Sequence, residues 1–379
     1  MNSDTFPGRL GLQQRVIPTY RAAFLDLLAG SCRAGLSVLA GQPLPIEGIA
    51  PVNQLQTAQL VRISNRYFSD PSSSLFVCWQ PGFLEWLQSW QPDVLIVEAN
   101  PRYPTTRQAI RWMHAQGRKV VGWGLGAPAI TGSLAGFRAR ERLSILHSLD
   151  AIIAYSRQGA EQYRQLGLPS EQVYVACNAV DPAPESAPPL RLIKADSQPN
   201  VLFVGRLQAR KRIDLLLRAC ASLPKGLQPH LVIVGDGPEK SRLVDLATQL
   251  YPAAEFPGAR QGEELIPYYA QADLFVLPGT GGLAIQQAMA QGLPVVVAQG
   301  DGTQDDLVRK ENGWQVPPGD LAALTNTLQQ ALSDRTRLRQ MGAASYRIVA
   351  DEINVEAMVR VFIEVLNKLL ECNTPSSTG

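Results

Sequence analysis

Short apolar runs of strand length alternate with longer amphipathic segments along most of this 379-residue chain. This alternation is typical of parallel β-sheets that carry helices on both faces. In the first half we expect strands at residues 10–16, 36–40, 75–79, 94–98, 119–123, 151–155 and 173–176. Helices are expected between them at residues 20–33, 82–90, 105–116, 138–148 and 159–166. The pattern predicts an α/β protein with doubly wound parallel sheets.

The alternation stops between residues 182 and 200, where five prolines fill a stretch with little apolar periodicity. Beyond it we expect strands at residues 201–204, 230–234, 274–277, 295–298 and 313–316, and helices at 320–333 and 352–370. The chain is also longer than one hydrophobic core usually spans. We therefore predict a domain of residues 1–181, a linker of 182–200, a second domain of 201–350, and a C-terminal helix and tail of 351–379. The helix is a candidate for packing back on the first domain.

The composition is that of an ordinary folded protein, with 45% hydrophobic and 18% charged residues and a formal net charge of +2. A charge so close to zero argues against a nucleic-acid partner. The five cysteines are scattered and form no close pair, so we interpret them as reduced thiols of a cytoplasmic protein. The first ten residues lack the pattern of a secretory signal, and no apolar run approaches the roughly 20 residues of a spanning helix.

Cationic residues gather after the strand expected at residues 201–204. Gly205 and Arg206 follow it directly, and Lys211 lies between two further arginines just before the next helix. Open parallel sheets bind ligands beyond the carboxyl ends of their strands. A guanidinium group can donate two hydrogen bonds to phosphate oxygens, and an ammonium group beside it adds a second positive charge. Together they could stabilise a departing diphosphate. Taken alone, a solvated basic turn explains this motif equally well.

Two glycine-rich turns follow later strands of the second half. Gly235 and Gly237 surround Asp236, where a ligand could approach the backbone, although a simple tight turn is the favoured interpretation. Gly279 and residues 281–283 precede a helix whose first free amides could point at an anion. Close packing of a small-residue helix is the alternative there. We favour the functional interpretation, because the glycines cost more backbone entropy than a turn requires.

In this order the motifs resemble those of the nucleotide-sugar glycosyltransferases of family 4, which adopt the two-domain GT-B fold. The resemblance is specific over residues 201–334 and looser in the first half, where residues 150–156 and 178–181 carry it. It implies a retaining transfer of a sugar from a nucleotide diphosphate to a hydroxyl, with no obligatory metal or other cofactor. The implied partners are a nucleotide sugar and a sugar, lipid-linked or small-molecule acceptor.

The resemblance also implies roles for individual residues. Arg206 and Lys211 would bind the donor diphosphate and act in catalysis. Further donor contacts are expected from the strand ends and the helix start of the second domain, at Gly205, Asp236, Phe256, Thr280, Gly281, Gly282, Leu283 and Gln287.

Two positions depart from the family pattern. Its two glutamates map to Gly279 and Gln287. The amide of Gln287 can still hydrogen-bond a ribose hydroxyl, but Gly279 leaves any sugar contact to the backbone or to Thr280. Carboxylates could instead come from Asp301, Asp305 and Asp306, although capping of the next helix by the last two is the slightly favoured alternative.

In the first domain we expect acceptor contacts from residues at two strand ends. Arg15, Tyr20 and Arg21 follow the first strand and could hold an anionic acceptor or a lipid phosphate, a solvated turn being equally plausible. Trp123 lies on the strand end where many family members carry a histidine, so a histidine base is not expected. The arginines at 138, 140 and 142 beside Phe137 suggest peripheral contact with the inner face of a membrane, but a solvated helix surface is the commoner explanation.

Three other functions are compatible with parts of this pattern. The departures at Gly279 and Gln287 also suit a binding or scaffolding protein that has lost transfer, and a nucleotide-sugar epimerase shares the fold. A dinucleotide oxidoreductase is disfavoured, because the glycines of residues 122–126 lie mid-domain with no acidic residue about 20 positions later. We therefore predict a glycosyltransferase.

Overall fold

The computed structural model describes residues 4–47, 49–69, 73, 76–132, 134–191, 198–281, 283–300 and 302–371. The chain divides into two compact units. We call residues 1–182 together with 355–379 the N-terminal unit, and residues 183–354 the C-terminal unit. The last helix of the chain thus belongs to the same unit as the first strand.

A seven-stranded sheet forms the centre of the N-terminal unit, in the order β3-β2-β1-β6-β7-β8-β9. All neighbouring strands in it are parallel. The strands are β1 Leu10–Gln14, β2 Leu36–Ala40, β3 Gln59–Arg62, β6 Val94–Glu98, β7 Lys119–Gly124, β8 Ala151–Ala154 and β9 Val173–Val175. The strand order reverses between β1 and β6, and the carboxyl ends of strands near such a switch point form the binding crevice of open α/β sheets.

One predicted strand lies outside this sheet, and one strand of the sheet was not predicted. β5 Val77–Trp79 pairs antiparallel with β4 Arg66–Phe68, although we expected residues 75–79 in the parallel sheet. Residue 75 itself is outside the described residues. The apolar side chains here pack into a small separate cluster with Tyr103. β3 was missed because it is an edge strand with no buried residue, and so has no apolar run.

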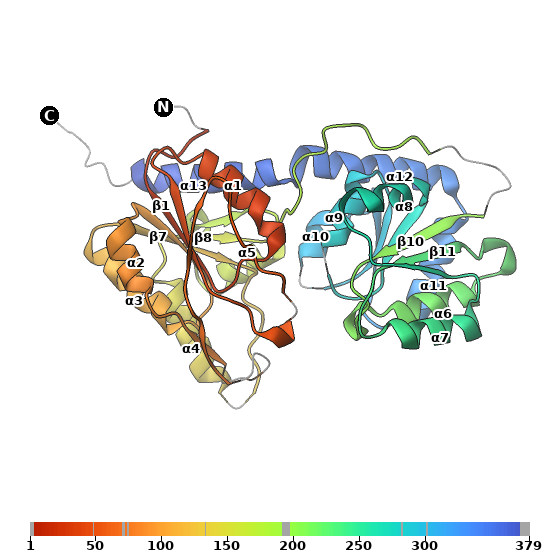
Figure 1. Ribbon diagram of the computed structural model, residues 1–379, viewed down its shortest axis with the longest axis horizontal. Helices are drawn as coiled ribbons and strands as arrows, with labels where there is room; N and C mark the ends of the chain where they lie inside the picture. The colour runs from red at the N-terminus through yellow and green to blue at the C-terminus, as the bar shows by residue number, and fades with distance from the viewer. Residues whose placement is uncertain are drawn as a thin grey trace. The chain divides into compact units, whose positions relative to one another are not determined.

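Helices cover the faces of this sheet (Figure 1). They are α1 Ala22–Gly30, α2 Phe83–Trp90, α3 Pro104–Ala115, α4 Ala135–Leu146, α5 Arg157–Gln165 and α13 Val355–Glu371. α13 packs on α1, where the ring centroids of Phe362 and Phe24 are 5.0 Å apart. Phe362 is completely buried, and burial of a phenylalanine side chain stabilises a fold by roughly 2–3 kcal/mol. The last helix is therefore part of the core of the N-terminal unit.

The C-terminal unit is built around a six-stranded sheet in the order β12-β11-β10-β13-β14-β15, with all neighbours parallel. Its strands are β10 Asn200–Val204, β11 His230–Val234, β12 Glu255–Gly258, β13 Leu274–Leu277, β14 Val295–Ala298 and β15 Gly313–Val316. Its helices are α6 Ile213–Ser222, α7 Lys240–Leu250, α8 Ile266–Gln271, α9 Leu283–Ala290, α10 Thr303–Leu307, α11 Leu321–Leu332 and α12 Arg335–Arg347. The prediction of doubly wound parallel sheets is confirmed in both units.

The accuracy of the strand predictions in this unit follows from burial. All residues of β13 and β14 are buried, so these central strands appear in the sequence as continuous apolar runs. The edge strand β12 was missed because it contains Pro257 and buries none of its residues. The polar helix α12 was missed as well.

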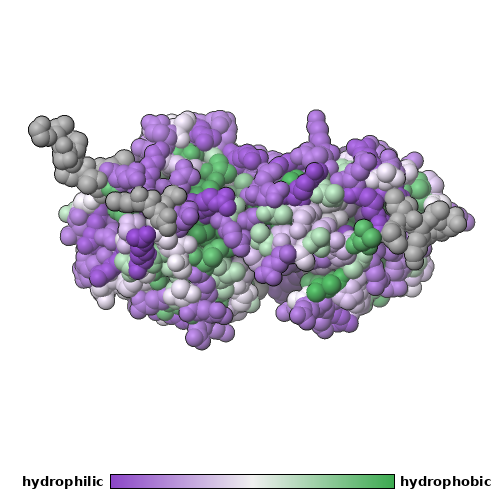
Figure 2. All heavy atoms as spheres, turned by 90° about the horizontal axis from the view of Figure 1, so that it is seen from above, coloured by the Kyte–Doolittle hydropathy of each residue, from purple (hydrophilic) through white to green (hydrophobic). Residues whose placement is uncertain are grey.

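The surface is mainly polar on the face shown in Figure 2, where apolar residues occur in small separate groups. Three of the more exposed large apolar side chains are close together in sequence, at Leu125, Leu134 and Phe137. Among the described residues, no helix has the length and apolar character needed to cross a membrane.

Candidate active site

Backbone packing shapes the strand ends of the C-terminal unit. The N–H of Leu207 donates to the carbonyl of Asp236 over 2.8 Å, which joins the turns after β10 and β11. A Cβ atom on Gly235 would overlap the carbonyl oxygen of Gly205, and one on Gly237 would lie 2.8 Å from the nitrogen of Leu207. Both glycines also have positive φ angles, 154° and 155°. The tight-turn interpretation therefore accounts for both glycines without a ligand.

A crevice of about 490 Å³ opens beyond these turns. Three predicted donor residues line it, Gly205, Arg206 and Asp236. Arg260 and Gln261 line the crevice beyond the end of β12 and were not predicted from the sequence. Since β12 itself was not recognised as a strand, its carboxyl end could not be identified either.

Asp236 already has local partners. Its carboxylate accepts a hydrogen bond from the backbone N–H of Gly237 over 2.7 Å and contacts the ammonium of Lys240 over 2.7 Å. The bonds to Lys240 and Gly237 lower the pKa of this exposed carboxyl. Asp236 is therefore a charged, locally paired side chain at the mouth of the crevice.

Lys211 lies directly against the glycine-rich turn that precedes α9. A Cβ atom on Gly281 would overlap Nζ of Lys211, and one on Gly279 would lie 2.6 Å from Cα of the same lysine. The N–H of Thr280 donates to the carbonyl of Arg210 over 3.1 Å, and its hydroxyl lies 3.4 Å from a guanidinium nitrogen of that arginine. The structure thus brings together Lys211, Thr280 and Gly281 of the predicted site.

The ammonium of Lys211 is held in a partly dehydrated position. Burial, together with the charge of nearby Arg210, lowers the pKa of Lys211 to about 8. A partly dehydrated cation interacts more strongly with an anion than an exposed one does. Lys211 is therefore suited to hold a phosphate beside the backbone at Gly281.

The two groups of predicted residues lie at one edge of the sheet. β10 and β13 are parallel neighbours, so Arg206 after β10 and the turn after β13 both follow carboxyl ends at that edge. Leu283 begins α9, and Gly282 is outside the described residues. Gln287 lies farther along α9, where its Oε1 is 3.5 Å from the hydroxyl of Tyr269. Phe256 is half-buried on β12.

The backbone explains one departure from the family pattern and excludes one alternative. Because Gly279 packs against the backbone of residues 210 and 211, this conformation leaves no room for a glutamate side chain. Asp305 and Asp306 lie inside the first turn of α10 and do not cap it, since its N-cap is Gly302. The capping interpretation was therefore wrong, and Asp301 is outside the described residues.

In the N-terminal unit, Arg15 is engaged in an internal ion pair. Its guanidinium bonds both carboxylate oxygens of Glu47, over 2.7 and 2.9 Å, and the hydroxyl of Tyr67 over 3.1 Å. Both charged side chains are only 15% exposed. This arrangement gives Arg15 a structural role within the unit, and its acceptor contact stays a prediction.

The guanidinium group of Arg21 contacts the aromatic rings of Trp123 and Tyr20. The guanidinium carbon of Arg21 is 4.8 Å from the ring centroid of Trp123 and 5.4 Å from those of Tyr20 and Tyr155. Arg21 is 4% exposed and Trp123 is 1% exposed. One guanidinium nitrogen of Arg21 and the indole nitrogen of Trp123 are buried without a hydrogen-bond partner among the described residues. The stack places a positive charge within an aromatic cluster.

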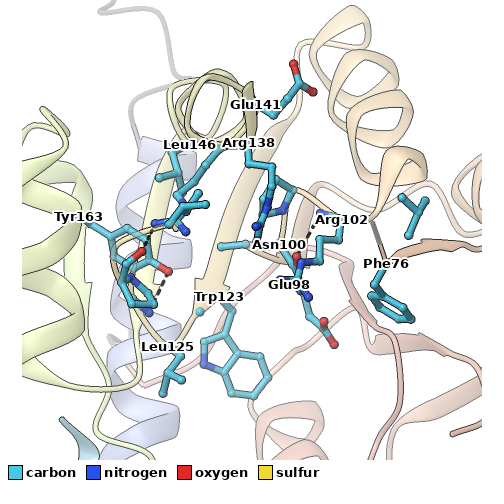
Figure 3. A pocket seen from close by; sticks show the side chains of 18 of the residues that line it. Phe76, Glu98, Asn100, Arg102, Trp123, Leu125, Arg138, Glu141, Leu146 and Tyr163 are labelled. Atoms are coloured by element: carbon cyan, nitrogen blue, oxygen red, sulfur yellow. Dashed lines mark hydrogen bonds between the residues drawn. The ribbon is translucent and has the colours of Figure 1, made fainter. Parts of the chain in front are cut away.

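A cavity of about 590 Å³ lies beside this cluster, at the carboxyl ends of β6, β7 and β8. Trp123 and Tyr155 line it, together with Glu98, Asn100 and Arg102 at the end of β6. Figure 3 shows Asn100, Arg102 and Arg138 above Trp123 and Leu125 in its view of the cavity. Residues 98–102 were not predicted as site residues, although their position at the end of a buried strand was a usable signal.

The three histidines lie in or beside regular secondary structure. His114 lies in α3, His147 directly follows α4 and His230 begins β11. Across the described ranges, no three His, Cys, Asp or Glu side chains are grouped so that they could hold a metal ion.

Comparison with known proteins identifies the family. Residues 191–348 match the family model described as glycosyl transferases group 1, and residues 43–184 match that of glycosyltransferase family 4. The chain belongs to the group 1 and family 4 glycosyltransferases. The resemblance seen in its sequence is confirmed.

Two curated relatives of this chain illustrate the breadth of the family. A GDP-mannose-dependent alpha-mannosyltransferase of Mycobacterium tuberculosis is 35% identical over 42% of this chain and 42% of its own length. The lipopolysaccharide core biosynthesis glycosyltransferase LpsE of Rhizobium meliloti is 30% identical over 59% of this chain and 66% of its own length. The chain thus matches less than two thirds of either relative.

A solved structure shows the same fold. HepE from Anabaena, determined in complex with UDP, superimposes with a TM-score of 0.71 at 18% identity, over 95% of this chain and 99% of that one. This chain therefore has the GT-B fold that the sequence predicted.

Proposed function

We propose that this protein is a retaining glycosyltransferase that moves a sugar from a nucleotide diphosphate to an acceptor hydroxyl. The observation that carries the proposal is the position of Lys211, whose partly buried ammonium lies against Gly281 just before α9. Arg206 follows the neighbouring strand and lines the crevice at the same edge of the sheet. HepE, which shares the fold, binds UDP, and this supports a nucleoside diphosphate as the donor group.

In this proposal the donor diphosphate is stabilised by protein groups and does not need a metal ion. The bond between the anomeric carbon and the diphosphate oxygen breaks, while Arg206, Lys211 and the amides at the start of α9 bind the developing negative charge. The acceptor oxygen bonds to the same face of the anomeric carbon. Its proton passes to the departing phosphate oxygen, which removes the need for a histidine at the strand end that carries Trp123.

Mass spectrometry of nucleotide sugars retained by the purified protein tests the donor, followed by titration with a panel of UDP- and GDP-sugars. A true donor should also be hydrolysed slowly in the absence of acceptor. Arg206→Ala should reduce hydrolysis on the order of 100-fold. Arg218→Ala is the matched control, because Arg218 is an exposed arginine on α6. Full activity in both Arg206→Ala and Lys211→Ala would refute the assignment.

A second candidate function is nucleotide-sugar binding without transfer. Gly279 favours it, because the backbone contact at this position excludes a carboxylate that the family usually carries. Donor binding with neither hydrolysis nor transfer, over a panel of acceptors, would support this candidate. A sugar isomer formed without any acceptor would instead indicate an epimerase.

A further inference from the structure

The cavity of the N-terminal unit gathers three arginine side chains. Arg102 follows β6, and Arg138 and Arg142 lie one turn apart on α4. The basic segment around Arg138 and Arg142 was recognised in the sequence, but Arg102 belongs to a separate segment and was not linked to it. The fold therefore adds Arg102 to this basic segment and concentrates positive charge on one cavity wall.

Within the described residues, no ion pair to an acid is found for these three side chains. Arg142 donates to the carbonyl of Pro128 over 2.6 Å, and Arg138 lies 3.5 Å from that of Thr131. Both partners are uncharged carbonyls. Burial lowers the pKa of Arg142, and the charges of Arg138 and Arg102 lower it further. Three guanidinium groups thus repel one another across this wall.

The two carboxylates that line the cavity have other partners. Glu141 forms an ion pair with Arg107 over 2.8 Å. Glu98 accepts a hydrogen bond from the backbone N–H of Arg15 over 2.8 Å, and burial raises the pKa of its carboxyl. Neither acid compensates the three arginines, so an anionic ligand would relieve their repulsion.

Another part of the cavity wall is apolar and reaches the surface through exposed apolar side chains. Trp123 and Leu146 on its wall are almost completely buried. Leu125, Leu134 and Phe137 also line it and are 40%, 42% and 64% exposed. Single exposed apolar residues are normal, but three beside one cavity indicate a surface that an apolar ligand covers.

We propose that this cavity binds an acceptor that carries a phosphate group next to an apolar chain or ring. Arg102, Arg138 and Arg142 bind the phosphate, and the apolar wall and its exposed rim hold the remainder. The role of this ligand as the acceptor rests on the proposed function. The binding itself requires only the cavity.

Direct binding of decyl phosphate to the full-length protein tests the proposal, below the concentration at which this amphiphile forms micelles. Decyl glucoside has the same chain without the charge, and inorganic phosphate has the charge without the chain. Isothermal titration calorimetry should show decyl phosphate binding at least tenfold more tightly than either. Equal affinity for decyl glucoside, or no binding of decyl phosphate, would overturn the proposal.

Substitutions locate the binding site. The double variant Arg102→Gln with Arg138→Gln should bind decyl phosphate at least tenfold more weakly. Arg140→Gln is the matched control, because Arg140 lies on the same helix but is exposed and does not line the cavity. Equal losses in Arg140→Gln would mean a non-specific charge effect and would contradict the proposal. Circular dichroism checks the fold, and Phe137→Ser at the exposed rim provides a second variant that should also weaken binding.

Vesicles distinguish the source of the phosphate. The protein should cosediment with phosphatidic acid vesicles but not with phosphatidylcholine vesicles if the phosphate belongs to a membrane lipid. Decyl phosphate should then reverse this cosedimentation. Binding of decyl phosphate without cosedimentation would identify a free acceptor. If decyl phosphate does not bind while nucleotide sugars are still hydrolysed, this inference alone fails. If nucleotide sugars neither bind nor react, the proposed function fails while the cavity can still bind its ligand.

Discussion

The two candidate sites differ in what builds them. In the C-terminal unit the site is shaped by backbone, because Gly235, Gly237 and Gly279 lie where a side chain would overlap a neighbouring turn. In the N-terminal unit the cavity is shaped by side chains from three strand ends and from α4. A backbone site requires glycine at fixed positions and therefore leaves a local motif. A cavity built from side chains combines residues far apart in the sequence, so only its α4 part could be noticed as a local feature.

The largest expected effect tests the catalytic role in the C-terminal unit. Lys211→Ala should lower turnover with the nucleotide sugar by about 10²–10³, since it removes a partly buried cation from the leaving diphosphate. The far-ultraviolet circular dichroism spectrum should not change. Lys225→Ala is the control, because Lys225 is an exposed lysine of the same unit. Comparable turnover in the two variants would mean that the backbone alone makes this site.

The next effect concerns the fold of that site. Gly279→Glu should lower the free energy of unfolding by about 3 kcal/mol, because its Cβ would lie 2.6 Å from Cα of Lys211. Thr280→Glu, at an exposed neighbour, should be tolerated. Urea unfolding measures both. A stable Gly279→Glu variant with improved activity would show that the turn can move to accept the family's glutamate.

These differences explain what the sequence could predict. The alternation of buried runs predicted both sheets, and the glycine turns and Lys211 pointed to one edge of the second sheet. Arg260 was missed because the edge strand before it is hardly buried. Arg102 was missed because a cavity shared by residues 98–102 and α4 exists only after folding. The roles of all these residues in donor and acceptor binding stay predictions.

Arg15 offers a test of structure against binding in the N-terminal unit. Arg15→Met should lower the free energy of unfolding by about 2 kcal/mol, because Glu47 would be left partly buried without its partner. The double variant with Glu47→Gln should recover part of that loss. The affinity for decyl phosphate should not change in either variant, as calorimetry would show. A tenfold loss of affinity in a folded Arg15→Met variant would instead support its predicted acceptor role.

A smaller effect should appear in the pH dependence of donor binding. The pKa of Lys211 is lowered to about 8, so its ammonium is charged below that pH and becomes neutral above it. Affinity for the nucleotide sugar should therefore be constant below about pH 8 and fall between about threefold and tenfold over the next pH unit. Lys211→Arg keeps the charge and should remove this dependence. The same decline in that variant would assign the titration to another group.

The smallest expected effect separates the two departures from the family pattern. Gln287→Glu restores the second glutamate on α9, where the side chain is half-buried with Oε1 3.5 Å from the hydroxyl of Tyr269. If this side chain reaches a donor hydroxyl, the carboxylate should strengthen that hydrogen bond by about 1 kcal/mol and tighten donor binding a few-fold. Gln291→Glu on the turn after α9 serves as the control for added charge. An equal change in donor affinity in both variants would indicate a general effect of the added charge. Tighter binding in Gln287→Glu alone would show that the glutamate can be restored at residue 287, so that of the two departures only Gly279 is required by the backbone.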